Sequence, residues 1–286
     1  MDTQKVWFVT GASKGLGLSL VKQLLAQGAQ VVATSRNVDE LQRAAGVDTD
    51  KFLPLAVDLK TEASVEQAVQ AAIAQFGRID VVVNNAGYGL LGSLEELTDQ
   101  EARENFDVNV FGSLNVIRQV MPHLRAQQSG HIINISSIGG FTGAFPGFGI
   151  YCATKFAVEG FSESLAAEAS AFGVNVTIVS PGYFRTDFLS ASSLGVPSRQ
   201  IDAYQAVRAT QQAHQADING NQPGDPEKAV VALIDIASVP TPPLHLFLGQ
   251  DAYELAQAKI QAVQQDLENW KEMTVSTGFN VQAAAQ

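Results

Sequence analysis

The stretch TGASKGLG, residues 10–17, directly follows the apolar run KVWFVT at residues 5–10 and leads into an amphipathic segment. Its glycines, Gly11, Gly15 and Gly17, let the chain turn tightly and approach a ligand closely. A helix that begins here directs free N–H groups and the positive end of its dipole at the turn, where they bind phosphate well. The spacing G-x-x-x-G-x-G differs from the common G-x-G-x-x-G fingerprint. The alternative is a turn that only joins a strand to a helix.

Short apolar runs alternate with longer amphipathic segments along the rest of the chain. Most of the runs are nearly continuous in Val, Ile and Leu, which is typical of strands buried on both faces of a parallel sheet. The predicted strands cover residues 5–10, 29–34, 52–57, 80–85, 131–136, 174–180 and 244–249. This alternation predicts an α/β fold, a Rossmann-type doubly wound parallel sheet of about seven strands with helices on both faces.

Two of the predicted helices have clear start signals. Residues 98–126 open with Thr98 and Glu101, which form a capping box. Residues 225–238 open with Asp225 as the cap and Pro226 at the first helical position.

No linker or repeat divides the chain, so we expect a single domain over residues 1–286. Residues 187–224, rich in Ser, Gln and Ala, are too long for a plain connection and are predicted to form a substrate loop or lid with short helices. Residues 251–286 are predicted to be a helical extension with its apolar residues broadly on one side. A helix that packs on the fold is favoured over one that modifies an oligomer interface.

The composition excludes several classes of function. The net charge is −11 with no basic cluster, whereas nucleic-acid binding needs a cationic surface. The single cysteine, Cys152, allows no internal disulfide, and no apolar run approaches the length of a transmembrane helix. The N-terminus has no signal-peptide pattern, so a soluble cytoplasmic protein with no membrane partner is expected. The four histidines have no ligand spacing, so no metal is predicted; a homo-oligomer is left open.

Three further motifs follow the glycine turn in order: NNAG at residues 84–87, YCATK at 151–155 and SPG at 180–182. Each motif alone is weak, but the four in this order resemble the short form of the short-chain dehydrogenase/reductase family. The resemblance covers roughly the first 190 residues and the seventh strand. It implies a nicotinamide cofactor and the interconversion of a carbonyl compound and its alcohol without a metal.

The end of the second strand predicts which nicotinamide is used. An acidic residue about 20 positions after the glycine turn would bind the ribose 2′-hydroxyl of NAD, but here Ser35 and Arg36 stand in its place. A hydroxyl and a guanidinium suit a 2′-phosphate instead, and Lys14 adds a second positive charge. NADP(H) is therefore the predicted cofactor, in line with similar members of the family. The alternative is that both cations are ordinary surface charges.

The resemblance also implies the remaining cofactor contacts. Asp58 would bind the adenine amino group, although it could instead cap the helix expected at residues 61–76. Thr186 and the backbone after the sixth strand would hold the nicotinamide carboxamide. The full predicted set is Gly11, Ser13, Lys14, Gly15, Leu16, Gly17, Ser35, Arg36, Asp58, Leu59, Asn85, Ala86, Gly87, Tyr151, Lys155, Pro181, Gly182 and Thr186.

Tyr151 and Lys155 are four residues apart and share a helical face. A free tyrosine titrates near pH 10, and a cation within about 4–6 Å lowers that pKa toward the pH at which general acid–base catalysis works best. The resemblance assigns Tyr151 as the proton donor in reduction and Lys155 as a ligand of the nicotinamide ribose. It also implies that Ser137, chosen over Ser136, binds the substrate oxygen, and that Asn109 binds a water connected to the lysine.

The predicted substrate pocket is apolar and aromatic, which suits a hydrophobic ketone, aldehyde or secondary alcohol. Its walls are expected to come from Tyr88, Leu90, Phe141, Phe145, Tyr183, Phe188 and residues 190–222, with Arg185 as a candidate carboxylate anchor. The sequence therefore favours an NADP(H)-dependent carbonyl reductase or alcohol dehydrogenase. Epimerases and dehydratases of nucleotide sugars share the Tyr–Lys motif but are longer. A non-enzymatic NADPH-binding redox sensor is the other alternative, and such proteins commonly lose the tyrosine or the lysine.

Overall fold

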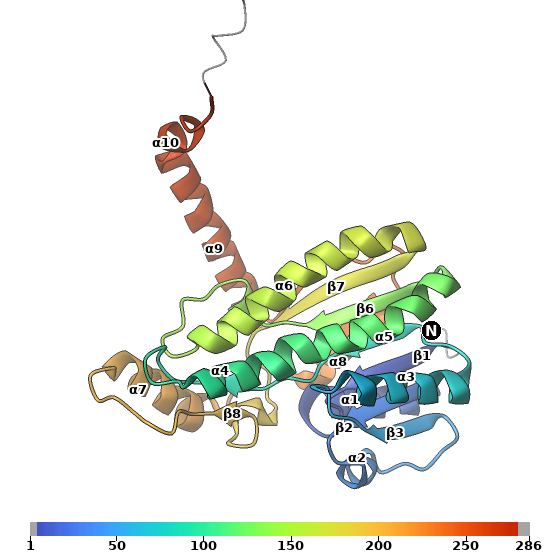
Figure 1. Ribbon diagram of the computed structural model, residues 1–286. Coiled ribbons are helices and arrows are strands. Elements are labelled where there is room, and N and C mark those ends of the chain that lie inside the picture. The colour runs from blue at the N-terminus through green and yellow to red at the C-terminus, as the bar shows by residue number, and fades with distance from the viewer. Residues whose placement is uncertain (1–4, 280–286) are drawn as a thin grey trace, which may run out of the picture.

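A parallel seven-stranded sheet forms the centre of the molecule in the computed structural model, which describes residues 5–279 (Figure 1). Its strand order is β3-β2-β1-β4-β6-β7-β9, so the order reverses beside β1. The strands are β1 (Val6–Thr10), β2 (Gln30–Ser35), β3 (Phe52–Ala56), β4 (Val81–Asn84), β6 (Gly130–Ile135), β7 (Val174–Pro181) and β9 (His245–Leu248). All seven predicted strands are confirmed, each to within a residue or so of its expected ends.

The sheet is buried on both faces because its central strands are apolar throughout. Every residue of β1 and β4 is buried. Pro54, which cannot donate a ladder hydrogen bond, lies in β3 at the edge of the sheet, where its missing N–H is tolerated. Ligands of such sheets bind beyond the carboxyl ends of the strands at the point where the order reverses, here the ends of β1 and β4.

Helices cover both faces, as predicted. One core joins the sheet to α1, α2 and α8, and the other joins it to α3, α5 and α6. The helices are α1 (Gly15–Ala26), α2 (Val38–Ala45), α3 (Glu62–Phe76), α4 (Asp99–Phe106), α5 (Gly112–Gln127), α6 (Gly149–Ala169), α7 (Gln205–Gln212), α8 (Pro226–Ile236), α9 (Gln250–Asn269) and α10 (Lys271–Val275). The Rossmann-type doubly wound fold is thereby confirmed.

The two predicted helix starts are also confirmed. Thr98 and Glu101 form both bonds of the capping box, and Asp225 accepts the N–H of Glu227 at the start of α8. The helix predicted over 98–126 is interrupted by a π-helical turn at Asp107–Phe111, which lies between α4 and α5. Such turns commonly mark functional positions.

Residues 187–224 fold against the carboxyl ends of the strands. They contain α7, a π-helical turn at Ala213–Ile218, and the short strand β8 (Leu194–Gly195). β8 pairs in parallel with β5 (Gly89–Leu90), which follows β4. We call residues 187–224 the lid below.

The C-terminal helix differs from its predicted form. Only Ala252 and Ala256 of α9 are buried, and the rest of the helix extends away from the sheet into solvent (Figure 1). A helix that packs along the fold was therefore the wrong expectation for this segment, whose last residues, 280–286, lie outside the described part of the chain.

Candidate active site

The glycine turn is closed against the end of β4. The Asn85 side chain donates hydrogen bonds to the backbone oxygens of Thr10 and Gly11, at 2.9 and 3.0 Å. Gly11 has a φ of +64°, and a Cβ there would lie 2.7 Å from the Ala86 Cα. A Cβ on Gly17 would lie 2.5 Å from the Asn85 amide nitrogen. The backbone can therefore take this compact form only with glycine at both positions.

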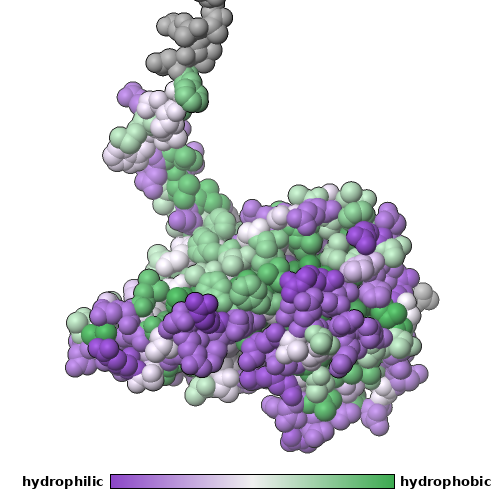
Figure 2. All heavy atoms as spheres, in the orientation of Figure 1, coloured by the Kyte–Doolittle hydropathy of each residue, from purple (hydrophilic) through white to green (hydrophobic). Residues whose placement is uncertain are grey.

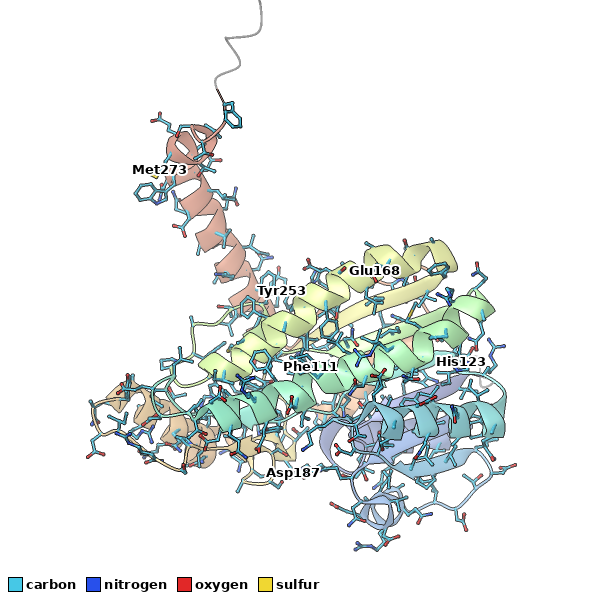
Figure 3. The ribbon with its side chains drawn as sticks, in the orientation of Figure 1. Phe111, His123, Glu168, Asp187, Tyr253 and Met273 are labelled. Atoms are coloured by element: carbon cyan, nitrogen blue, oxygen red, sulfur yellow. The ribbon has the colours of Figure 1, made fainter. Side chains whose placement is uncertain are left out.

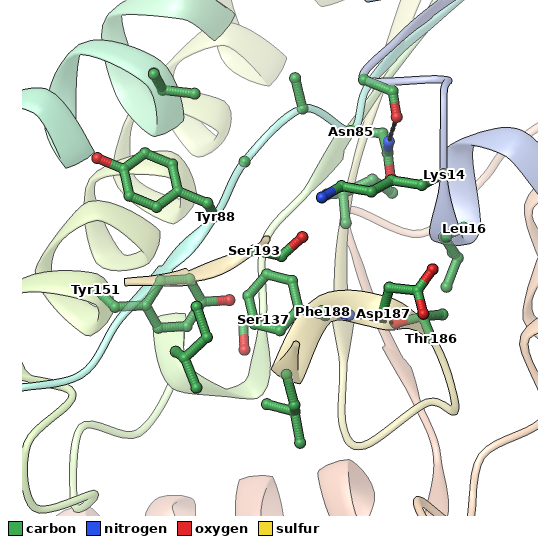
Figure 4. A pocket seen from close by; sticks show the side chains of 18 of the residues that line it. Lys14, Leu16, Asn85, Tyr88, Ser137, Tyr151, Thr186, Asp187, Phe188 and Ser193 are labelled. Atoms are coloured by element: carbon green, nitrogen blue, oxygen red, sulfur yellow. Dashed lines mark hydrogen bonds between the residues drawn. The ribbon is translucent and has the colours of Figure 1, made fainter. Parts of the chain in front are cut away.

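A single cavity of about 1060 Å³ opens from this turn and runs beneath the lid (Figure 4). It is lined by 17 of the 18 predicted cofactor residues, including Tyr151 and Lys155. The structure therefore brings these distant parts of the chain together at one place. The exception is Gly17, which is buried under the turn. Of the predicted catalytic residues, Ser137, Tyr151 and Lys155 line the cavity, whereas Asn109 is buried behind its wall.

The far end of the cavity carries the predicted 2′-phosphate residues. Arg36 is exposed at the end of β2, and the Lys14 ammonium donates to the backbone and side-chain oxygens of Ser192 in the lid, at 3.0 and 2.9 Å. The Ser35 hydroxyl donates to the Asn37 carbonyl at 2.6 Å, so its proton is already engaged. The Asp58 carboxylate lines the cavity and accepts the Lys60 N–H, whereas the N-cap of α3 is Thr61, so the alternative that Asp58 caps this helix was wrong.

Ser137, Tyr151 and Lys155 converge beyond the carboxyl end of β6, and Figure 4 shows Ser137 and Tyr151 there. The Ser137 Oγ accepts the N–H of Gly139 at 3.0 Å, and the Lys155 Nζ donates to the Ile135 carbonyl at 2.9 Å. The Lys155 Nζ lies 5.9 Å from the centre of the Tyr151 ring. The helical spacing of Tyr151 and Lys155 thus directs both side chains at one end of the sheet.

Asn109 lies on the π-helical turn between α4 and α5. Its side chain accepts the N–H of Tyr88 at 3.0 Å and donates to the Tyr88 carbonyl and the Thr154 hydroxyl, at 3.0 and 3.1 Å. It therefore joins the segment after β4 to the helix that carries Tyr151 and Lys155. The water contact implied by the family resemblance stays a prediction.

Burial has the largest effect on the pKa values of Tyr151 and Lys155. It raises the pKa of Tyr151 above its usual value, and the Ser137 hydroxyl acts in the opposite direction. It also lowers the pKa of Lys155 to about 8, although the Glu159 carboxylate acts to raise it. The expectation of a lowered pKa for Tyr151 is therefore wrong for this structure, because burial removes the phenolate from water and raises the pKa.

Of the six single residues that we expected in the pocket wall, four line the cavity. Tyr88, Phe145, Tyr183 and Phe188 line it. Leu90 instead lies buried in β5. Phe141 packs edge-on against Phe247, with ring centres 5.1 Å apart.

Sequence reasoning expected residues 190–222 in the wall without singling out His214 or Gln222, and it missed Phe148 and misjudged Arg185. Phe148, His214 and Gln222 line the cavity, and no motif marks them. The positions of His214 and Gln222 depend on how the lid folds, and Phe148 directly precedes α6. Arg185 was a candidate carboxylate anchor, but its guanidinium donates to the Gln222 carbonyl at 3.1 Å and does not line the cavity. Burial raises the pKa of Cys152 to about 11, which fits the packing role expected for this thiol.

A buried ion pair fastens the lid to the rest of the molecule. The Nη2 group of Arg208 donates to both oxygens of the fully buried Glu96 carboxylate, at 2.7 Å each. It also accepts the N–H groups of Ile201 at 2.7 Å and Ser93 at 2.8 Å. Burial acts to raise the pKa of Glu96, but these hydrogen bonds and Arg208 hold it below its usual value. The lid therefore depends on one charged side chain for several of its contacts.

Glu96→Gln is expected to loosen the lid, because the amide keeps the size of the side chain but loses its charge. A hydrogen bond to a charged group contributes about 1.5–3 kcal/mol, so we expect amide exchange over residues 198–212 to be at least about tenfold faster. Hydrogen-exchange mass spectrometry measures this. Glu95→Gln is the matched control, since Glu95 bonds only the exposed Tyr204 hydroxyl among the described contacts. Equal exchange in the two variants would contradict the role of Glu96.

Comparison with known proteins gives the family. A family model described as short chain dehydrogenase matches residues 5–195. The chain belongs to this family. The oxidoreductase BOA17 of Botryotinia fuckeliana is 35% identical over 274 residues, covering 96% of this chain and 99% of that protein. The 3-ketodihydrosphingosine reductase of Bacteroides thetaiotaomicron is 37% identical over 247 residues, covering 86% and 88%.

Solved structures of other short-chain dehydrogenases have the same fold. One from Streptomyces avermitilis superimposes with a TM-score of 0.89 at 35% identity, covering 98% of this chain and all of that chain. A 3-ketoacyl-(acyl-carrier-protein) reductase from Brucella melitensis in complex with NADH gives 0.70 at 27% identity, covering 85% and 96%. A serine dehydrogenase in complex with NADP+ gives 0.73 at 26%, covering 85% and 94%. This short-chain dehydrogenase is thus an oxidoreductase whose structural neighbours bind nicotinamide cofactors.

Two further observations concern the described residues alone. Across residues 5–279, no helix is long and apolar enough to cross a membrane. In the same range, no three His, Cys, Asp or Glu side chains are grouped as they would be around a metal ion.

Proposed function

We propose that this short-chain dehydrogenase interconverts a hydrophobic ketone or aldehyde and its alcohol with NADP(H), as a carbonyl reductase or alcohol dehydrogenase of the cytoplasm. The observation that carries the proposal is the meeting of Ser137, Tyr151 and Lys155 in a cavity with aromatic walls and two cations, Lys14 and Arg36, among its lining residues. The relative that bears the name of a 3-ketodihydrosphingosine reductase supports a ketone as substrate.

The cradle around the glycine turn fits a nicotinamide dinucleotide. Side chains on Gly11 or Gly17 would collide with neighbouring atoms, so bare backbone faces the cavity beside the start of α1. That helix N-terminus suits the pyrophosphate, and Lys14 and Arg36 suit a 2′-phosphate. When bound, the cofactor supplies or accepts the hydride.

The protein's own groups handle the proton. The Ser137 Oγ already accepts the Gly139 N–H, so its hydroxyl proton is free to bond the substrate oxygen. Tyr151 keeps its proton at neutral pH because burial raises its pKa, so it is ready to donate to that oxygen during reduction. The Lys155 ammonium favours the phenolate that this transfer leaves behind. The lid excludes water from the site.

The test is turnover of a panel of ketones, aldehydes and secondary alcohols by the purified protein, followed by the absorbance of NADPH. We expect turnover of hydrophobic carbonyl compounds and a preference for NADPH over NADH. A protein that binds NADPH but turns over none of them would favour the alternative, a non-enzymatic redox sensor. The filled tyrosine and lysine positions argue against that alternative.

Cofactor affinity should depend on the charge of Lys155. Burial lowers the pKa of this group to about 8, so the ammonium is lost as the pH rises through that value. We therefore expect the Kd for NADPH, measured by fluorescence titration, to increase above about pH 8. Lys155→Met should bind NADPH more weakly and lack this step. A wild-type Kd that stays constant through this range would show that the charge is not needed for binding.

A further inference from the structure

Two residues at the lid end of the cavity form a hydrogen-bonded chain with a fixed direction. His214 lies on the π-helical turn of the lid, with its Nδ1 2.8 Å from the Thr210 carbonyl oxygen. Its Nε2 lies 2.9 Å from the Tyr183 hydroxyl. A carbonyl oxygen only accepts, so Nδ1 must carry a proton, and in the neutral imidazole Nε2 is then an acceptor. The Tyr183 hydroxyl therefore donates its proton to His214.

This arrangement leaves Tyr183 as a pure hydrogen-bond acceptor toward the cavity. Burial raises its pKa, so the phenol keeps its proton at neutral pH, and that proton is engaged by His214. Only the lone pairs of the oxygen remain for a ligand. They can bind an O–H or N–H group but offer nothing to an ether or a second carbonyl.

The chain lies close to the predicted reaction centre. His214 packs against Phe148 with ring centres 4.9 Å apart, and Phe148 packs against Tyr151 at 5.9 Å. Tyr183, His214 and Tyr151 line the same cavity. A molecule whose carbonyl oxygen reaches Tyr151 can therefore extend along the Phe148 ring toward Tyr183.

We propose that Tyr183, oriented by His214, selects carbonyl substrates that carry a second polar group, a hydroxyl or an amine, away from the carbonyl. This inference rests on the proposed function and names the substrate class of the same site. Tyr183 is the residue that contacts the substrate, and His214 is a positioning residue that fixes the direction of its hydrogen bond.

The test uses aliphatic ketones of equal chain length that carry a hydroxyl, methoxy or methyl group at one position. We expect wild-type kcat/KM to favour the hydroxyl over the methyl compound by about tenfold, and Tyr183→Phe to abolish that ratio. Tyr253→Phe, at an exposed position on α9, is the matched control and should retain it. His214→Leu removes the acceptor of the Tyr183 hydroxyl proton, so Tyr183 can donate it to a ligand. The kcat/KM of the methoxy compound should then rise relative to that of the hydroxyl compound.

The outcomes separate this inference from the proposed function. A wild-type kcat/KM ratio near one between the hydroxyl and methyl compounds would overturn the selection by Tyr183. So would a ratio that Tyr183→Phe leaves unchanged. Calorimetric binding of the same ketones in the presence of NADP+ measures the preference without turnover. If no ketone is reduced, the proposed function fails, and the binding ratio still decides the inference.

The C-terminal helix carries a second inference on independent grounds. Beyond the buried Ala256, apolar side chains of α9 are exposed, with Ile260 at 48% and Leu267 at 60%, and so is Trp270, directly after the helix, at 58%. Figure 2 shows apolar surface along the projecting helix, and Figure 3 shows Tyr253 and Met273 on the part of the chain that leaves the body.

The spacing of these side chains is that of a coiled-coil seam. Residues 256, 260, 263, 267 and 270 alternate in steps of four and three, as the a and d positions of a heptad do. Such a narrow stripe suits a partner helix better than a flat surface. Residues 250–275 carry five acidic and two basic side chains, which disfavours an anionic membrane.

We further propose that this seam pairs with the same seam of a second copy of the chain. Two identical helices offer identical apolar stripes, so a two-fold axis matches one to the other. The helix is fixed at its base by Ala252 and Ala256, which removes part of the cost of holding it in place. Pairing would bury the exposed Ile260, Val263 and Leu267 of α9 together with Trp270 directly after it.

Analytical ultracentrifugation of the full chain tests this pairing. We expect a wild-type dimer and at least a tenfold weaker dimer in Leu267→Glu, which places a charge in the seam. Gln261→Glu adds the same charge outside the seam and should dimerise as the wild type does. A monomeric wild type, or a Leu267→Glu variant that dimerises normally, would overturn the proposal. So would binding of monomeric wild type to phosphatidylcholine vesicles.

Discussion

Tyr151→Phe is expected to lower kcat for ketone reduction by about 10²- to 10⁴-fold, the usual contribution of a general acid. The variant loses the proton that the substrate oxygen must receive but keeps the ring. The ring packs against Phe148 and Phe188, with centres 5.9 and 5.8 Å apart, so its apolar contacts should survive. We therefore expect the Kd for NADPH to stay nearly the same while turnover falls.

Single-turnover kinetics with saturating NADPH separates this loss from slower product release. Tyr253→Phe, exposed on α9, makes the same chemical change far from the predicted proton transfer and serves as the control. Thermal unfolding of both variants checks that the fold is intact. A Tyr151→Phe enzyme with half the wild-type rate would remove Tyr151 as the proton donor.

The second large effect concerns cofactor choice. Combining Ser35→Asp with Arg36→Ala should shift the ratio of kcat/KM for NADPH and NADH toward NADH by at least about tenfold. The carboxylate repels a 2′-phosphate and accepts the ribose 2′-hydroxyl instead, while a lost charged hydrogen bond costs about 1.5–3 kcal/mol. Since the Ser35 hydroxyl donates to Asn37, we expect most of the change to come from charge.

Arg43→Ala provides the control for this pair of substitutions. Arg43 is an exposed cation on the neighbouring helix α2 and does not line the cavity. It should leave the cofactor ratio as it was. If the double variant also keeps the wild-type ratio, the 2′-phosphate must be bound elsewhere, with Lys14 as the next residue to change.

The sheet could be predicted because its signals are local. Nearly continuous apolar runs such as Val81–Asn84 indicate buried parallel strands, and the capping residues Thr98 and Asp225 mark helix starts within a few residues of themselves. Most cavity-lining residues at strand ends were instead expected from the family resemblance of short local motifs, and the parallel strands bring them together because their carboxyl ends meet at one edge.

The features that the sequence did not predict depend on contacts between distant parts of the chain. Glu96 and Arg208 are 112 residues apart, and nothing near either one in the sequence indicates that they form a buried pair. His214 lies on the π-helical turn at Ala213–Ile218, and no sequence pattern predicted this turn. The amphipathic stripe of α9 was visible in the sequence, but a stripe looks the same whether it covers the chain's own core or faces away from it. The pKa of Tyr151 was misjudged because burial cannot be read from a Tyr–Lys spacing.

The family match ends at residue 195, part of the way through the lid. The nucleotide turn and Ser137, Tyr151 and Lys155 all lie before that point, whereas Arg208, His214 and Gln222 lie after it. The residues of the proposed proton transfer thus lie before the end of the match, whereas the proposed substrate pocket is divided, with Tyr183 before that point and His214 after it. We therefore expect changes within residues 196–224, which include His214, to alter substrate preference while Ser137, Tyr151 and Lys155 stay in place.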